Sequence, residues 1–147
     1  MQDGDRGRYV ISPKDMMALD RIPQILDTGA VSLKIEGRMK SAAYVYETVK
    51  AYRTALDAAE RGAAVQAETL LRPVEENFNR GYTQAYLDDC VSGRMMTGEA
   101  PGNRGVPIGK AEEIKKGFFY FRTEMPLQPD RMEGISYAAA GGGLAFL

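Results

Sequence analysis

The chain contains no histidine and only one cysteine, and these two shortages exclude several common kinds of catalytic site. Without histidine, the chain by itself cannot form a Ser-His-Asp triad, a Cys-His pair or a His-Glu-x-x-His zinc site. A single cysteine, Cys90, cannot form an internal disulfide and cannot alone hold an iron–sulfur cluster or a structural zinc. Two aspartates precede it and disfavour a thiolate, so we interpret Cys90 as an incidental thiol.

Charge and hydropathy limit the class of protein further. The 147 residues are 44% hydrophobic and 27% charged, which is typical of a soluble globular protein. The formal net charge of −1 creates no long-range field for nucleic acid, so any contact with RNA would need a local patch. No apolar run is long enough to span a membrane, and residues 1–5 lack the form of a secretory signal. We therefore expect a cytoplasmic protein with no membrane partner.

A short strand is expected over residues 31–35, directly before a charged segment. Its alternation places the apolar side chains on one face and Lys34 and Glu36 on the other. In α/β enzymes the junction between a strand and the following helix usually carries the chemistry. Two interpretations stay open: the charged face lines a substrate site, or Glu36 only forms an ion pair with Lys34 or Arg38 at the strand end.

Helices are expected on both sides of this strand. Ser12 as N-cap, Pro13 at the first helical position and Asp15 in a capping box predict a helix that begins near residue 13. Pro23 should kink or restart that helix, and Gly29 should end it.

The clearest predicted helix begins after Ser41 as N-cap and ends at Gly62. A shorter helical segment, interrupted at Pro73, should follow and end at residues 79–81. The apolar stripe expected on the long helix consists of Val45, Val49, Tyr52 and Leu56. A strand, a charged loop and a helix form half of a βαβ unit, and a lone parallel strand leaves its backbone groups unpaired. A complete (β/α)8 barrel needs about 250 residues, so we infer a fragment of a larger protein.

The second half of the chain changes from helical to strand periodicity. Residues 92–105 are rich in glycine and proline and predict a linker. We therefore divide the chain into an α/β part over residues 1–91, this linker, and a β part over residues 106–147. The β part predicts the start of a small antiparallel barrel-like domain. Its candidate strands are residues 106–114, 118–122, 135–137 and 144–146, the first two forming a hairpin.

Several motifs, in one order, resemble the collagenase-like peptidase family U32. They are residues 11–15, the run SLKIEGRMKS at 32–41, the helix at 44–56, residues 78–83 and residues 101–106. The resemblance implies that residues 8–62 are the last units of a TIM-barrel-like catalytic domain, and that residues 103–147 open a small β-barrel domain similar to those of translation factors. It implies that the parent protein is a peptidase, a hydrolase acting on peptides or proteins, and we expect no turnover from this chain alone.

Two alternative functions stay open. Some members of the family are similar proteins that hydroxylate tRNA, ribosomal RNA or quinone precursors, several with an iron–sulfur cluster held by cysteines, so RNA is an alternative partner. Most of those cysteines lie upstream of the matched region, and many relatives carry another where this chain has Met16 and Met17. We therefore expect no metal or other cofactor in this chain. The second alternative is a non-catalytic remnant or binding module. The sequence predicts no oligomeric state.

The resemblance also assigns candidate site residues. Lys34, Glu36, Arg38 and Lys40 match the family motif Lys-Ile-Glu-Gly-Arg-Met-Lys. Glu36 is the candidate general acid/base or substrate-orienting carboxylate, Arg38 the candidate binder of an anion or carbonyl, and Lys34 a third catalytic candidate. Arg104 should mainly fix the turn into the β part, although it could meet an RNA phosphate. The candidate substrate-binding residues are Lys40, Lys14, Asp15 and Arg104.

Overall fold

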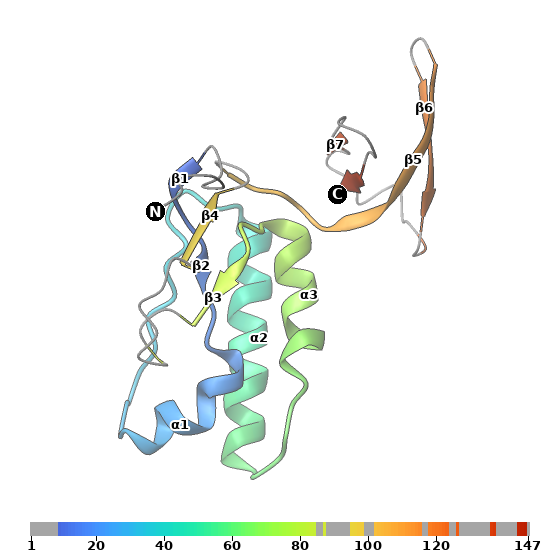
Figure 1. Cartoon of the computed structure of the whole chain (residues 1–147). Helices are drawn as coiled ribbons and strands as arrows, with labels where there is room; N and C mark the ends of the chain where they lie inside the picture. Colours follow the sequence, from blue (N-terminus) through green and yellow to red (C-terminus); the bar gives the residue numbers. More distant parts are fainter. Residues whose placement is uncertain are drawn as a thin grey trace, which may run out of the picture. The chain divides into compact units, whose positions relative to one another are not determined.

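A computed structural model of the chain describes residues 9–84, 87, 95–98, 102–115, 118–123, 126, 136–137 and 144–146 (Figure 1). The chain divides into two compact units, residues 1–103 and 104–147, which are described separately below. Cys90 and parts of the expected linker, including residues 99–101, lie outside the described residues.

The first unit combines helices with two small two-stranded sheets (Figure 1). Strand β1 pairs antiparallel with β4, and β2 pairs parallel with β3. In chain order its elements are β1 (Tyr9–Pro13), β2 (Asp15–Met16), the 3-10 helix η1 (Leu19–Arg21), α1 (Ile22–Asp27), α2 (Ala42–Glu60), α3 (Ala67–Asn77), β3 (Tyr82–Thr83) and β4 (Met96–Gly98).

The prediction of a helix that begins near residue 13 is wrong, because β1 and β2 occupy this region. The backbone nitrogen of Lys14 donates to the carbonyl of Met95 at 2.8 Å, and that of Asp15 donates to Gly81 at 3.0 Å. These partners lie far away in the chain, so pairing between distant segments outweighs the local capping signal. The first α-helix begins only at Ile22.

The prediction that Gly29 ends the helix is confirmed, whereas the helix from residue 13 that Pro23 was expected to kink or restart is replaced by strands. Pro23 lies in the first turn of α1, where a missing N–H costs little, so the proline starts this helix rather than interrupting it. Gly29 follows the helix with a φ of +81°, and its nitrogen donates to the carbonyl of Leu26 at 2.9 Å.

The prediction of a strand over residues 31–35 is also wrong. This segment connects α1 to α2 without regular secondary structure, and none of the described strands pairs with it (Figure 1). Val31 is fully exposed, and Leu33 is 37% exposed. A strand needs a neighbour for its backbone groups, so the alternation of apolar residues alone does not produce one.

Helix α2 begins and ends as predicted, but only Tyr52 and Leu56 of its predicted apolar stripe pack against the core. The Ser41 hydroxyl accepts the Tyr44 N–H at 3.1 Å, and Gly62 follows the helix with a φ of +65°. Val45 and Val49, expected in the buried stripe, are 38% and 48% exposed. The residues that α2 buries are Tyr44, Thr48, Ala51, Ala55 and Ala58.

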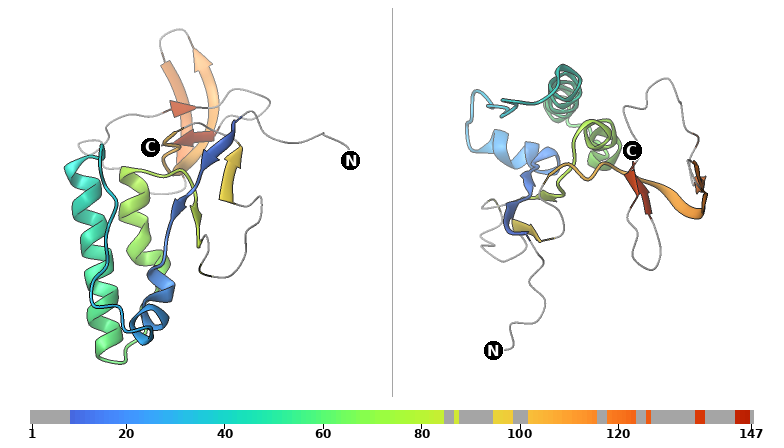
Figure 2. Two further views of the ribbon diagram at one scale, coloured as in Figure 1. Left: turned by 90° about the vertical axis from the view of Figure 1, so that its left-hand side faces the viewer. Right: turned by 90° about the horizontal axis from the view of Figure 1, so that it is seen from above.

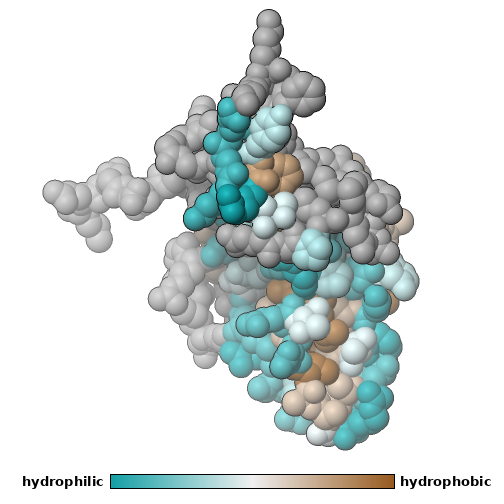
Figure 3. Space-filling view, turned by 90° about the vertical axis from the view of Figure 1, so that its right-hand side faces the viewer, coloured by the Kyte–Doolittle hydropathy of each residue, from teal (hydrophilic) through white to brown (hydrophobic). Residues whose placement is uncertain are grey.

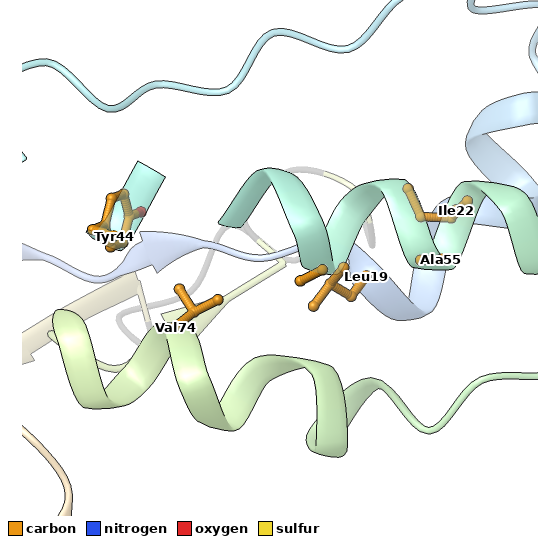
Figure 4. Close-up of a cluster of buried hydrophobic side chains, with 6 residues drawn as sticks. Leu19, Ile22, Tyr44, Ala55 and Val74 are labelled. Carbon is orange, nitrogen blue, oxygen red and sulfur yellow. The ribbon is translucent and has the colours of Figure 1, made fainter. Parts of the chain in front are cut away.

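The small side chains on this buried face let α2 pack beside α3 (Figure 2). The core lies between these helices and η1, and it contains Leu19, Ile22, Tyr44, Ala51, Ala55 and Val74 (Figure 4). Pro73 lies inside α3 without interrupting it, contrary to our prediction. Packing of the adjacent Val74 into the core holds the helix together past the proline. On the face shown in Figure 3, the hydrophobic side chains of this helical part lie between hydrophilic ones.

The second unit contains a four-stranded antiparallel sheet of order β6-β5-β8-β7. Its strands are β5 (Pro107–Lys115), β6 (Phe118–Thr123), β7 (Ser136–Tyr137) and β8 (Leu144–Phe146), which confirms the predicted hairpin and the two further strands. Gly109 lies where β5 approaches β6 so closely that an added Cβ would come within 1.9 Å of the Arg122 carbonyl oxygen. Closure into a barrel, and the TIM-barrel-like character of the first unit, stay predictions.

Candidate functional site

A groove of about 580 Å³ lies in the first unit between the segment 30–40, α2 and the loop that follows α3. Its apolar wall includes Ile25, Leu33 and Ile35. Its charged lining residues are Asp15, Lys34, Glu36, Arg38, Lys40 and Arg80.

The groove gathers most, but not all, of the predicted site residues. Lys14 is not among its lining residues, although its backbone holds β1 near Met95. Arg104 belongs to the second unit. The predicted residues that line the groove are Asp15, Lys34, Glu36, Arg38 and Lys40.

Glu36 forms one of the two ion pairs that we considered. The Lys34 Nζ lies 3.6 Å from Glu36 Oε2, and the two side chains are 86% and 75% exposed. A pair so open to water contributes little to stability, because solvent screens the charges. The Glu36 carboxylate therefore stays accessible to a molecule in the groove.

Asp15 and Arg80 form a second ion pair at the groove, and water reaches this pair less than it reaches Lys34 and Glu36. Arg80 Nε donates to Asp15 Oδ2 at 3.2 Å, and Arg80 Nη2 donates to Asp15 Oδ1. The two side chains are only 17% and 27% exposed, respectively. The hydrogen bond to Asp15 raises the pKa of Arg80 above its ordinary value, so Arg80 is a fixed cation.

Lys40 is held by aromatic rings rather than by a carboxylate. Its Nζ lies 2.9 Å from the centroid of the Phe78 ring and 5.8 Å from that of Tyr44. The two rings meet edge to face, with centroids 6.0 Å apart. The Arg80 guanidinium carbon lies 5.6 Å from the same Phe78 ring. Among the described residues, Lys40 forms no ion pair.

Burial has the largest effect on the Lys40 ammonium. It lowers the pKa of Lys40, and the nearby Arg80 lowers it further, whereas Asp15 acts in the opposite direction. Burial also raises the pKa of Tyr44, with Asp15 adding to the effect. Among the described residues, the rings and the two cations therefore form one cluster whose charges interact around the carboxylate of Asp15.

A turn places Arg38 and Lys40 at the groove. The Lys40 nitrogen donates to the Gly37 carbonyl at 3.1 Å, and Met39 takes the left-handed conformation with a φ of +67°. A Cβ at Gly37 would lie 3.1 Å from a methyl group of Val45, so a larger residue would press on α2. Among the described residues, Arg38 has neither a hydrogen bond nor an ion pair from its side chain.

The part of the groove wall that contains Ala18, Thr48 and Tyr52 has a structural role. The Tyr52 hydroxyl accepts the Ala18 N–H at 2.9 Å, and burial raises the pKa of Tyr52. The Thr48 hydroxyl donates to the Tyr44 carbonyl at 2.7 Å. Both bonds satisfy polar atoms in the wall, and the first ties α2 to the segment between β2 and η1.

Sequence reasoning assigned no role to Arg80 or Phe78. Arg80 lies 65 positions from Asp15, so no local pattern connects the two residues. The available signal was their place in the motif at residues 78–83, which carried the family resemblance.

The groove carries an excess of positive charge. Four cations, Lys34, Arg38, Lys40 and Arg80, face the two carboxylates of Asp15 and Glu36, which leaves a net charge of +2. Within the described part of the chain, no group of three His, Cys, Asp or Glu side chains could hold a metal ion. No helix among these residues has the length and apolar character needed to cross a membrane.

Comparison with known proteins decides the family. The family model described as peptidase family U32 matches residues 1–97. The chain belongs to peptidase family U32. No solved structure matches it.

Known U32 relatives have two kinds of names. An uncharacterized protease of Methanocaldococcus jannaschii is 34% identical over 116 residues, which are 75% of this chain and 28% of the relative. The tRNA hydroxylation protein P of Escherichia coli is 36% identical over 85 residues, 58% of this chain and 18% of the relative. A collagenase of Porphyromonas gingivalis is 34% identical over 82 residues, 54% of this chain and 22% of the relative. The chain thus spans only 18 to 28% of the length of these relatives.

Proposed function

We propose that this chain forms part of the substrate-binding site of a U32 enzyme that acts on RNA. The observation that carries the proposal is the pair of groove cations, Arg38 and Lys40, with which no described carboxylate forms an ion pair. Proteins that bind RNA use lysine and arginine side chains to contact phosphate groups. A local patch of this kind provides the contact that the overall net charge of −1 does not.

The pairing of charges in the groove also supports an RNA substrate. The two carboxylates each already face a cation, Glu36 facing Lys34 and Asp15 facing Arg80. A polyanion entering the groove therefore meets the two remaining cations without an equal repulsion from unpaired carboxylates. The relatives named as tRNA hydroxylation proteins, and a relative named as a 23S rRNA 5-hydroxycytidine synthase, are consistent with this proposal.

Peptide hydrolysis is the second candidate function, and Glu36 favours it. This carboxylate is 75% exposed at the groove, where a peptide carbonyl and an attacking water could reach it. Arg38 would then bind the substrate carbonyl or a carboxylate. The relatives named as a protease and as collagenases are consistent with this candidate.

Binding measurements separate the two candidates. We expect the chain to bind labelled tRNA with an affinity that falls as salt rises, because each phosphate contact releases counterions. Replacing Arg38 with glutamine should make the slope of log affinity against log salt shallower by about 0.7 to 0.9. The matched control is Arg53→Gln, since Arg53 is an exposed cation of α2 that pairs with Asp57 and does not line the groove.

Activity measurements on the parent protein complete the test. RNA from a strain lacking the gene should lose a hydroxylated nucleoside in mass spectrometry, whereas gelatin cleavage by the purified parent protein should be absent or unaffected by Glu36→Gln. Normal RNA modification in the deletion strain, together with gelatin cleavage that Glu36→Gln abolishes, would replace this proposal with the peptidase candidate.

A further inference from the structure

We infer that Lys40, held over the Phe78 ring beside the Asp15–Arg80 pair, is a preformed binding position for one phosphodiester group of an RNA strand. This inference deepens the proposed function and rests on it. It assigns a defined role to Lys40 and a positioning role to Phe78.

The first argument is the unequal number of charges in the cluster. Lys40 and Arg80 lie at the same ring, 2.9 Å and 5.6 Å from its centroid, and in the part of the chain that the structure describes, Asp15 supplies the one carboxylate that acts on both. Arg80 engages both oxygens of that carboxylate. An arriving monoanion therefore relieves the repulsion between the two cations, and it meets no carboxylate that still lacks a partner.

The second argument concerns the hydrogen-bond donors of Lys40. A lysine ammonium has three N–H donors, and a ring face takes them up only weakly. Among the described residues, no oxygen accepts a hydrogen bond from Lys40 Nζ. Phosphate oxygens are strong acceptors of charge-assisted hydrogen bonds, so they can use donors that the ring leaves available.

The third argument is preorganisation. Phe78 is fixed at the end of α3, where its nitrogen donates to the Val74 carbonyl at 3.0 Å. Tyr44 is buried in the first turn of α2 and contacts Phe78 edge to face. Two packed helices thus hold the rings that hold the ammonium, and binding orders less of the lysine side chain than it would for a free surface lysine.

Lys50 provides a matched comparison on the same helix. Its Nζ also lies near an aromatic ring, 5.6 Å from the centroid of Tyr46, but it forms an ion pair with Glu47 at 3.3 Å. Lys50 does not line the groove. It has the same charge and a similar ring contact, and it differs in having a carboxylate that already uses its donors.

The experiment measures binding of a labelled single-stranded RNA to the whole chain by fluorescence anisotropy over a range of salt concentrations. Lys40→Gln should weaken binding about tenfold, as expected for one lost charge-assisted contact. It should also make the salt slope shallower by about 0.7, the value for one phosphate contact on a single strand. Lys50→Gln should change the affinity less than about twofold.

Phe78→Leu tests the positioning role separately. This variant keeps both cations, so the salt slope should stay the same while the affinity falls, because Lys40 loses the ring that holds it. Urea unfolding followed by circular dichroism identifies the folded fraction. Lys40→Arg keeps the positive charge and should retain the salt slope, so it tests the position even if Phe78→Leu does not fold.

Three outcomes would overturn the inference. If the unaltered chain does not bind RNA, the proposed function fails and the inference fails with it. If RNA binds but Lys40→Gln behaves like Lys50→Gln, only the inference fails. The third outcome is that polyglutamate or inorganic phosphate displaces the labelled RNA as strongly as unlabelled RNA does at the same concentration. The position would then bind anions in general and not the phosphodiester of an RNA strand.

Discussion

Replacing Leu19 with alanine tests the packing that positions the site. Leu19 is 1% exposed and lies in η1, which contacts α1, α2 and α3. Such a substitution removes buried methyl groups and leaves a cavity that neighbouring elements fill only in part. We expect the free energy of unfolding to fall by about 3 kcal/mol, the lower part of the range for buried leucines, because the surrounding unit is small and can partly collapse.

The measurement is urea unfolding followed by far-ultraviolet circular dichroism, which reports mainly on the helices. With a slope of about 2 kcal/mol per M, the midpoint should move by about 1.5 M. Since a domain is stable by only about 5 to 15 kcal/mol, a loss of this size removes a large part of the stability of the first unit.

Val49→Ala on α2 is the control for this experiment. Val49 is 48% exposed, and alanine forms helices better than valine, so the free energy of unfolding should change by less than about 0.5 kcal/mol. A loss at Val49 equal to that at Leu19 would contradict the observed orientation of α2, and it would restore the stripe through Val45 and Val49 that the sequence predicts.

Three further predictions concern other contacts of the first unit. Ser41→Ala removes the N-cap of α2 and should lower the free energy of unfolding by about 1 kcal/mol in urea, whereas Ser41→Asp should keep the cap. Asp15→Asn removes one charge from the shielded pair with Arg80 and should cost about 1 to 3 kcal/mol in the same assay; an unchanged midpoint would show that the pair is not formed. Burial raises the pKa of Tyr52 and of Tyr82, so as pH rises the unfolded chain releases these protons before the folded chain does. The free energy of unfolding should therefore fall as pH rises above about 10, the ordinary tyrosine pKa. Tyr52→Phe should reduce that fall in urea midpoints measured against pH.

The features predicted correctly from the sequence are those that local chemistry determines. Ser41 caps α2 through a hydrogen bond to a residue three positions away, and Gly29 and Gly62 take positive φ values that other residues avoid. The β5–β6 hairpin pairs two strands that follow each other in the chain. Each of these signals involves only a few consecutive residues, so the sequence around it is sufficient.

The features predicted incorrectly depend on segments that lie far apart in the chain. The capping pattern at Ser12 and Asp15 is genuine as a local pattern, but pairing with Gly81 and Met95 decides the structure there. Residues 31–35 have the alternation of a strand and no described partner. Val45 and Val49 have helical spacing, yet the alanines of α2 face α3 instead, because small side chains allow the closer approach.

The candidate site shows the same division. Lys34, Glu36, Arg38 and Lys40 lie in one motif, which named all of them as candidate site residues, and all four line the groove. Arg80 and Phe78 come from the loop after α3, more than 35 positions beyond Lys40, and only the fold brings them to it.

The Lys40 cluster and Glu36 differ in how firmly the structure holds them. This difference suits the cluster to binding more than it suits Glu36 to catalysis. In the cluster of Asp15, Lys40, Phe78 and Arg80, Asp15 lies in β2, Lys40 directly precedes the N-cap of α2 and Phe78 directly follows α3. Neighbouring packed elements thus hold its geometry before a substrate arrives. Glu36 lies in a segment without regular secondary structure and is 75% exposed, so water surrounds the group with the clearest potential for acid/base chemistry. Acid/base catalysis gains most where a group is held in place and shielded from bulk water. We therefore expect the Lys40 cluster, rather than Glu36, to hold the substrate proposed above.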